Sequence, residues 1–231
     1  MARGSLCTIV FTLSAAACVS RTAAYTSPTE PIIQYIVMEK SCPSATIEEK
    51  KTDPVTPEYH ALLDTIAWAE GTDHHYNMMI GRMLFTDYSS HPIETGEMPE
   101  KGIPFKTREG KYWRIMYSSA AGRYQFLYRT YKSLKDEGFF QTGFSPAEQD
   151  RAAIYLIQTD EVTQEVLDEA IQEKNAVQKQ QEFIEIWHNL SGTWASLPHK
   201  KTKRSRYQSQ FANKNEDLQK VFFIYYGQHK K

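Results

Sequence analysis

Apolar residues first recur with regular spacing between residues 56 and 71. They stand three or four positions apart, which places them on one face of a helix. The triplet Thr-Pro-Glu at residues 56–58 predicts the helix start, because it provides a capping hydroxyl, a proline whose missing N–H costs nothing there and an acid in the first turn. Gly71 predicts the helix end. The apolar face consists of Tyr59, Leu62, Leu63, Ile66 and Ala67.

The pattern changes between Gly81 and Ser119, where short aromatic and β-branched runs are broken by glycine and proline. Such runs predict a small β-hairpin region. Helical spacing then returns, and Ser145 with Glu148 predicts a capping box at a helix start. Later helices are indicated by Phe183, Trp187 and Leu190 and by Leu218, Val221, Phe222 and Tyr225. The sequence therefore predicts a mostly helical α+β domain.

The first residues have the pattern of a secretory leader. Arg3 precedes an apolar run over residues 6–19 that is too short to span a bilayer comfortably, and small residues follow it. We therefore expect residues 1–24 to be a signal peptide and the mature protein to be exported, acting in the periplasm or outside the cell. The alternative is a lipid anchor at Cys18, which follows three alanines but lacks the leucine usual in bacterial lipoprotein signals.

Residues 25–55 are rich in proline and polar residues, which indicates a tether. An apolar run at residues 32–38 interrupts it and is compatible either with a strand that docks on the domain or with a partner-binding segment. The folded domain is expected to occupy residues 56–231.

Composition adds little about function. The chain of 231 residues is 41% hydrophobic and 24% charged, which fits one globular domain with a leader and a linker. A net charge of −1 neither demands nor forbids a polyanionic partner, and the basic residues lack the aromatic interleaving of a nucleic-acid site. Cys7 and Cys18 lie in or beside the leader, so only Cys42 is sure to remain after cleavage and no intramolecular disulfide is expected. We expect no metal or cofactor.

Glu70 continues the apolar face of the first helix. A carboxyl group on an apolar stripe loses water, and at the carboxyl end of a helix it meets the negative pole of the helix dipole. Both effects favour the protonated form, as a general acid requires. The alternative from this helix alone is a boundary glutamate paired with a basic neighbour.

Five ordered blocks stand out along the chain: AWAEGTD at residues 67–73, LFTDYSSHP at 84–92, AGRYQFL at 121–127, FSPAEQD at 144–150 and WASLP at 194–198. Over roughly residues 57 to 212 they resemble the phage lambda endolysin family of lysozyme-like enzymes; in the fourth block the match is to FSP at 144–146 and QD at 149–150. Their order and approximate spacing hold throughout, which is more specific than any one short motif.

The resemblance implies a lysozyme-like α+β domain, mostly helical with a small β-hairpin region lining the cleft. It further implies a lytic transglycosylase that cuts the β-1,4 bond between N-acetylmuramic acid and N-acetylglucosamine in peptidoglycan and leaves anhydro-muramic ends, with Glu70 as acid and then base. One alternative is a hydrolytic lysozyme that uses water. Another is a non-catalytic peptidoglycan-binding protein with the same fold.

The resemblance also implies substrate-binding residues. Gln125 matches the glutamine that transglycosylases place near the acid, where an amide can bind an acetamido group or orient the carboxyl; the alternative is a glutamine at a helix start. Gly122 would let backbone and sugar approach closely. Arg123 and Tyr124 could bind substrate or, alternatively, pack against the hairpin. The expected substrate-binding set is Thr72, Arg123, Tyr124, Gln125, Tyr207 and Gln208.

Two further acids are candidates for a second catalytic carboxylate. Instead of acting in catalysis, Asp73 could cap the helix end, and Asp87 could fix a turn through Asx hydrogen bonds. The adjacent His74 and His75 invite a metal site, but neighbours in sequence rarely face one ion and no matching ligand spacing appears elsewhere. We therefore expect these histidines to be cleft or surface residues.

Residues 199–206 carry five lysine and arginine side chains where the family has a short glycine-containing link. A solvated surface loop is one interpretation. The other is attraction, through the stretch from Lys200 to Arg206, to the carboxylates of peptide stems or to an anionic envelope surface. Residues 74–77 replace a longer loop of the family and residues 93–117 are expanded, so the preferred length of substrate is expected to differ. The protein is expected to be a monomer that binds glycan strands.

Overall fold

The computed structural model describes residues 55–109, 111–207 and 210–231. The expected signal peptide, the lipid-anchor alternative at Cys18 and the tether up to residue 54 lie outside the described residues, as does the apolar run at 32–38. Among the residues that are described, no helix is both long enough and apolar enough to cross a membrane.

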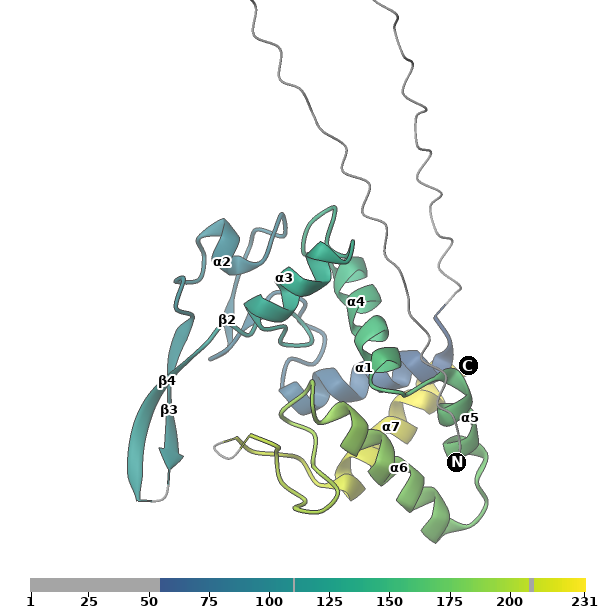
Figure 1. Ribbon diagram of the computed structural model, residues 1–231. Helices are drawn as coiled ribbons and strands as arrows, with labels where there is room; N and C mark the ends of the chain where they lie inside the picture. The colour runs from purple at the N-terminus through teal and green to yellow at the C-terminus, as the bar shows by residue number, and fades with distance from the viewer. Residues whose placement is uncertain (1–54, 110, 208–209) are drawn as a thin grey trace, which may run out of the picture. The chain divides into compact units, whose positions relative to one another are not determined.

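The described residues form helices around one central helix, α1, with two small antiparallel sheets between α1 and α3 in chain order (Figure 1). This is the α+β class that the sequence predicts. The helices are α1 (Pro57–Glu70), α2 (Pro92–Thr95), α3 (Tyr128–Asp136), α4 (Pro146–Thr159), α5 (Gln164–Gln172), α6 (Ala176–Leu190) and α7 (Asn215–His229), and the strands are β1 (Met78–Met79), β2 (Met83–Leu84), β3 (Ile103–Glu109) and β4 (Tyr112–Ser118).

Helix α1 begins and ends where the sequence predicts. The Thr56 hydroxyl accepts a hydrogen bond from the Tyr59 backbone N–H, and Gly71 adopts the left-handed conformation that closes the helix, with φ of 71°. The helix packs against α4, α5 and α7. Because neighbours surround it, burial extends beyond the predicted face and includes Ala61, Asp64 and Thr65. The two buried polar side chains find different partners. The Thr65 hydroxyl donates to the Ala61 carbonyl within the helix at 2.7 Å, whereas the Asp64 carboxylate pairs with Arg123 from another segment.

The other predicted helices are confirmed with one correction. Ser145 caps α4 by accepting from the Glu148 backbone N–H. The reciprocal half of the expected capping box is wrong, because the Glu148 carboxylate accepts from the Phe140 backbone N–H at 2.8 Å and so ties the preceding loop to α4. Helices α6 and α7 match the late apolar patterns, whereas the sequence analysis did not specify α2, α3 and α5.

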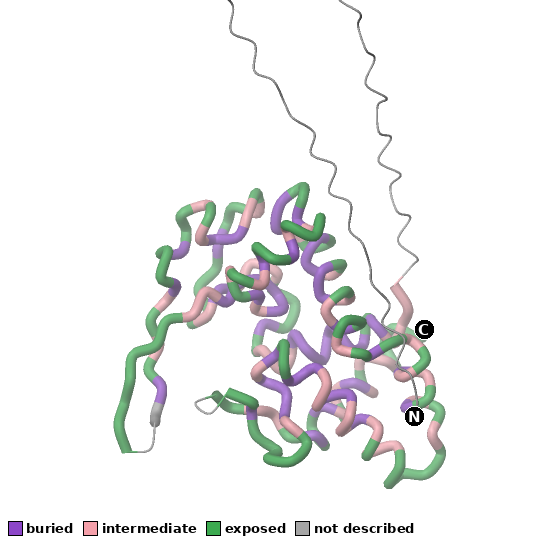
Figure 2. The backbone as a smooth tube through the Cα atoms, in the orientation of Figure 1, coloured by how far each residue is buried: buried purple, intermediate pink, exposed green. Residues whose placement is uncertain are grey.

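The predicted β-hairpin region is confirmed, although it begins slightly earlier, at Met78. Strand β1 pairs with β2, and β3 pairs with β4 from Ile103 opposite Ser118 to Glu109 opposite Tyr112. Strand β4 is exposed along almost its whole length, as Figure 2 shows. The β3–β4 hairpin therefore has large side chains that the core does not cover.

An aromatic cluster joins the hairpin segment to α3 and α4. Phe144 lies at its centre, with ring centroids 5.9 Å from Phe85, 5.5 Å from Tyr131 and 5.3 Å from Phe140. His91 packs 5.4 Å from the same ring and is fully buried. Desolvation lowers the pKa of His91 to about 4, so this histidine of the LFTDYSSHP block is a neutral part of the core.

Candidate active site

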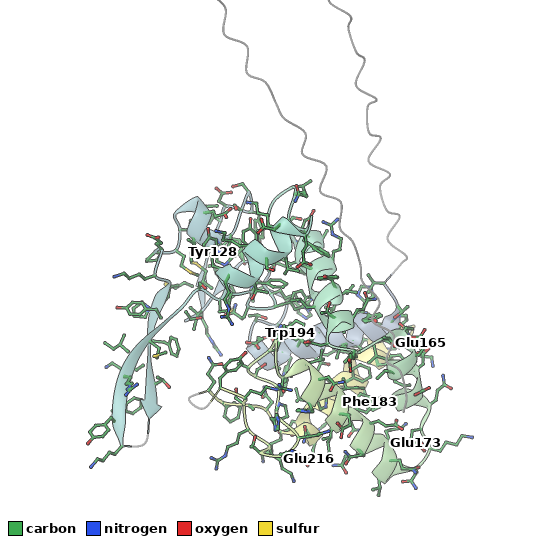
Figure 3. The ribbon with its side chains drawn as sticks, in the orientation of Figure 1. Tyr128, Glu165, Glu173, Phe183, Trp194 and Glu216 are labelled. Carbon is green, nitrogen blue, oxygen red and sulfur yellow. The ribbon has the colours of Figure 1, made fainter. Side chains whose placement is uncertain are left out.

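A cleft of about 880 Å³ lies between the β3–β4 hairpin and the loop that follows α6. Glu70 lies in it, at the carboxyl end of α1. Tyr128 and Trp194, both labelled in Figure 3, line the cleft from the start of α3 and from the loop after α6. The hairpin contributes Phe105, Thr107 and Met116. The cleft is thus assembled from segments far apart in the sequence around one carboxyl group.

The Glu70 carboxyl is partly exposed and poorly solvated. Loss of water raises its pKa to about 7, and hydrogen bonds from Ser196 oppose that shift. The Ser196 hydroxyl donates to Oε1 of Glu70 at 2.7 Å. A carboxyl with this pKa is protonated in a large fraction of molecules near neutral pH, so it can donate a proton and take one back.

Ser196 is a site residue that sequence reasoning did not single out. It is buried, and its carbonyl accepts from the Asn213 backbone N–H at 2.8 Å and from the Asn213 side chain at 3.2 Å. The Asn213 amide also donates to the Ala69 carbonyl, one residue before Glu70. Asn213 therefore fixes the loop that carries Ser196 to the end of α1. The signal for Ser196 was its place inside the WASLP block, whereas no motif pointed to Asn213.

Gln125 lies in the cleft, but not at a helix start. Its backbone has a φ of 49°, which is sparsely populated for residues other than glycine. The side-chain amide donates to the carbonyls of Met78 at 3.0 Å and Gly122 at 2.9 Å. Both amide hydrogens are used in this way, so the group that remains for a ligand is the carbonyl oxygen Oε1.

Gly122 does not serve the purpose expected from the sequence. Its φ is 80°, and an added Cβ would collide with the side-chain amide of Gln149. That amide also accepts from the Arg123 backbone N–H at 2.8 Å. The close approach at Gly122 is therefore to Gln149 of α4 and not to a sugar, and it packs the AGRYQFL block against the FSPAEQD block.

Thr72, Arg123 and Tyr124 are buried and are not among the residues that line the cleft. The Thr72 hydroxyl donates to the Arg123 carbonyl, the Arg123 guanidinium pairs with Asp64, and the Tyr124 hydroxyl donates to Asp150 at 2.6 Å. Their partners lie on α1 and α4, so the hairpin contacts considered for Arg123 and Tyr124 are replaced by these. The substrate-binding role expected of the three does not fit this burial; they hold the segment between α1 and Gln125.

Tyr207 lines the cleft and is 43% exposed. Its hydroxyl donates to the Gly192 carbonyl at 2.8 Å, which fixes the ring beside the loop after α6. Gln208, its neighbour in the expected set, lies outside the described residues. Of the expected site residues that are described, the structure brings Glu70, Gln125 and Tyr207 to one cleft.

The two candidate second carboxylates do not line the cleft. Asp87 accepts from the Ser89 backbone N–H at 2.8 Å, which is the Asx turn considered as its alternative, and Ser89 lowers the pKa of this carboxyl. Asp73 is exposed at the end of α1 and has a φ of 49°. The acidic residues among those lining the cleft are Glu70 and Glu100, and Glu100 is exposed.

His74 and His75 are exposed residues beside α1 and not part of the cleft lining. His74 Nδ1 lies 3.5 Å from the Arg123 guanidinium, a contact at the limit of a hydrogen bond. Within the described part of the chain, no three histidine, cysteine or acidic side chains are grouped so that they could hold a metal ion.

Two curated proteins with similar sequences are both phage endolysins. The endolysin of Escherichia phage lambda is 36% identical over 111 residues, which are 42% of this chain and 57% of the relative. The endolysin of Escherichia phage P2 is 37% identical over 109 residues, 42% of this chain and 60% of the relative. The chain thus spans less than two thirds of the length of the curated relatives it matches.

Two solved structures of bacteriophage lambda lysozyme share the fold. The one in complex with a chitohexasaccharide is 27% identical, with a TM-score of 0.51, and the other is 25% identical, with a TM-score of 0.52. Each match covers 75% of this chain and 96% of the solved chain. The α+β fold described above is therefore lysozyme-like. Since the Endolysin family model also matches residues 60–229, which include the cleft and nearly every described helix, the chain belongs to the Endolysin family.

Proposed function

We propose that this protein is a peptidoglycan lytic transglycosylase in which Glu70 is the catalytic acid and base. The observation that carries the proposal is the Glu70 carboxyl, whose pKa is raised to about 7 by burial inside a saccharide-sized cleft. Membership of the Endolysin family and the chitohexasaccharide bound by lambda lysozyme support a glycan as the ligand.

In this mechanism the protonated Glu70 donates its proton to the glycosidic oxygen while the bond to C1 breaks. The carboxylate that forms accepts two hydrogen bonds from Ser196, which stabilise the ionised form. It then takes the proton of the muramic C6 hydroxyl as that oxygen bonds to C1, which closes the anhydro ring. Because the nucleophile belongs to the substrate, its high effective molarity replaces an activated water, and the proton returns to Glu70.

Hydrolysis by water is the alternative reaction. A glycosidase with a water nucleophile usually has a second carboxylate opposite the acid. The second acid among the described residues that line the cleft, Glu100, is exposed and makes no hydrogen bond or ion pair with another described residue. We therefore favour the one-carboxylate mechanism. Gln125 would accept a hydrogen bond from an acetamido N–H through Oε1, and Tyr207 would contact a sugar face.

Peptidoglycan lies outside the cytoplasmic membrane, so the proposed activity requires that the domain reach the periplasm or the exterior. Export by the signal peptide proposed at residues 1–24 would provide this route. The other alternative is a peptidoglycan-binding protein without catalytic activity, and the release of fragments from purified peptidoglycan distinguishes it from an enzyme.

The test is mass spectrometry of the fragments released from purified peptidoglycan by the wild-type protein and by Glu70→Gln. We expect anhydro-muramic ends from the wild type and a loss of roughly 10³-fold in rate for the variant, the usual scale for removal of a general acid. Asp73→Asn is the matched control and should retain at least half of the activity. Reducing ends in place of anhydro ends would convert the proposal to a hydrolase, and no release by the wild type would favour a binding protein.

A further inference from the structure

A second hollow, of about 1060 Å³, lies beside the cleft in the segment that joins the WASLP block to α7. Tyr207, Gln210 and Phe211 line both the hollow and the cleft. A ligand that occupies the cleft therefore lies next to the mouth of the hollow, and a side branch of that ligand can enter it.

The hollow is strongly basic. Lys203, Arg204, Arg206 and Lys214 line it, and none of its described lining residues is acidic. Arg206 is fixed in place, because its Nε donates to the Ser191 hydroxyl at 2.8 Å and its guanidinium also reaches the His188 carbonyl. The side chains of Lys203, Arg204 and Lys214 make no hydrogen bond or ion pair with other described residues. Their charges are thus available to an anion.

Lys200, in the same loop, differs from these residues because it has an acidic partner. It does not line the hollow, and its ammonium pairs with Glu185 of α6 at 2.7 Å. An acid thus pairs with a cation of this loop outside the hollow, whereas Lys203, Arg204 and Lys214 inside it have no acidic partner among the described residues. Such an arrangement resembles a binding site more than a uniformly solvated loop.

We propose that this hollow, defined by Lys203, Arg204, Arg206 and Lys214, binds the carboxylates of the peptides that branch from a glycan strand held in the cleft. The inference rests on the proposed function and deepens it. Peptidoglycan is a neutral sugar backbone with carboxylate-bearing peptide branches, so cations beside the cleft meet the branch and not the strand. A bilayer surface is a poorer fit, because a flat sheet of headgroups does not enter a hollow.

The test compares two substrates of the full-length protein. One is glycan strands with their peptides; the other is strands from which an amidase has removed the peptides and whose freed lactyl carboxylates have then been converted to amides, so that the sugar backbone stays neutral. The readout is the ratio of kcat/KM for peptide-bearing over peptide-free strands. Exposed charge pairs are individually weak, so we expect Lys203→Gln/Arg204→Gln to lower this ratio by about five- to tenfold. The control Lys201→Gln/Lys174→Gln removes two exposed charges outside the hollow and should change the ratio by less than about twofold.

An unchanged ratio for Lys203→Gln/Arg204→Gln would overturn the inference while leaving the proposed function intact. If the ratio is unchanged but that variant binds more weakly to vesicles of anionic lipid, the hollow contacts a membrane surface and not the peptide branches. Cleavage of neither substrate by the wild type would overturn the proposed function and this inference with it.

Discussion

Two of the three carboxyl groups of helix α1, those of Asp64 and Glu70, lie in opposite surroundings. Asp64 is buried in the middle of the helix, where its carboxylate pairs with the Arg123 guanidinium and lies 2.7 Å from Nε2 of His229 on α7. Glu70 lies at the end of the same helix, where its carboxyl accepts a hydrogen bond from the neutral Ser196. One acid has a buried cation and the other has a hydroxyl and a backbone amide.

The difference shows how one helix supports both structure and chemistry. A buried carboxylate beside a guanidinium ties elements together, because separating the charges would leave each unpaired in a dry interior. A carboxyl without a cation becomes a weaker acid, because ionising it in a poorly solvated site costs free energy. The Asp64 region thus holds α1, α7 and the loop before α3, and the Glu70 region can exchange a proton near neutral pH.

The largest effect on stability should come from Asp64→Asn. This change leaves the Arg123 guanidinium buried without its counter-charge, since its side chain is 7% exposed. We expect the free energy of unfolding to fall by about 3 kcal/mol, as is typical for breaking a buried ion pair. Urea denaturation at pH 7 measures it.

The double variant Asp64→Leu/Arg123→Met is the control for that prediction. It removes both charges, so it should cost less than the sum of the two single changes in a double-mutant cycle. A loss below about 0.5 kcal/mol for Asp64→Asn would contradict the comparison, because it would be the size expected of a surface substitution.

The next effect is the pH dependence of stability caused by Glu70. Its pKa is about 7 in the folded state and near the ordinary 4.5 when unfolded, so between these values only the folded chain keeps the proton. Stability from this group is present below pH 4.5 and is lost as the pH rises to 7. Glu70→Gln cannot ionise, so relative to wild type it should gain about 2 kcal/mol between pH 4 and pH 8, less than the full shift because the carboxyl is partly exposed.

Urea denaturation of both proteins at several pH values checks this gain. Asp87→Asn is the contrasting control, because Ser89 lowers the pKa of the Asp87 carboxyl. Its stability relative to wild type should therefore fall, not rise, as the pH increases through the acidic range. A Glu70→Gln difference that stays constant from pH 4 to pH 8 would mean that Glu70 is not desolvated.

Ser196→Ala sharpens the comparison by removing the hydroxyl that favours ionised Glu70. The pKa of Glu70 should rise further above its ordinary value, so the alkaline limb of kcat/KM against pH should move up by about one unit. Ser119→Ala is the matched control, since Ser119 also lines the cleft but its hydroxyl accepts from the Tyr128 backbone N–H. If the alkaline limb of kcat/KM stays at the wild-type pH in Ser196→Ala, the Ser196 hydroxyl does not influence the pKa of Glu70.

The two regions also differ in what the sequence predicts about them. The ends of α1 and the face that carries Glu70 are local properties, set by Thr56, Gly71 and the apolar spacing, and all three are predictable. The partner of each acid is not local. Ser196 lies 126 positions from Glu70 and Arg123 lies 59 positions from Asp64, and no spacing rule relates them.

The same limit explains the misassigned neighbours of Gln125. A glycine, an arginine and a tyrosine next to a candidate binding residue carry no signal of whether they face a ligand or the core. Gly122 is fixed by Gln149 and Tyr124 by Asp150, both from α4. Packing of the segment before α3 against α4 decides these roles, and it appears in the sequence only as the joint presence of the AGRYQFL and FSPAEQD blocks.

The smallest expected effect is that of Glu100→Gln, which extends the comparison to an exposed carboxyl in the lining of the same cleft. Glu100 precedes the hairpin and is exposed to water, so it lacks the desolvation that makes Glu70 an acid near pH 7. If Glu70 works without a second carboxylate, kcat/KM for peptidoglycan should change by less than about twofold, as for other exposed charges. A loss of about a hundredfold or more would instead identify Glu100 as the base that activates a water molecule, and the product should then carry reducing ends. Measuring rate and product together therefore decides whether burial of one carboxyl is sufficient for the reaction.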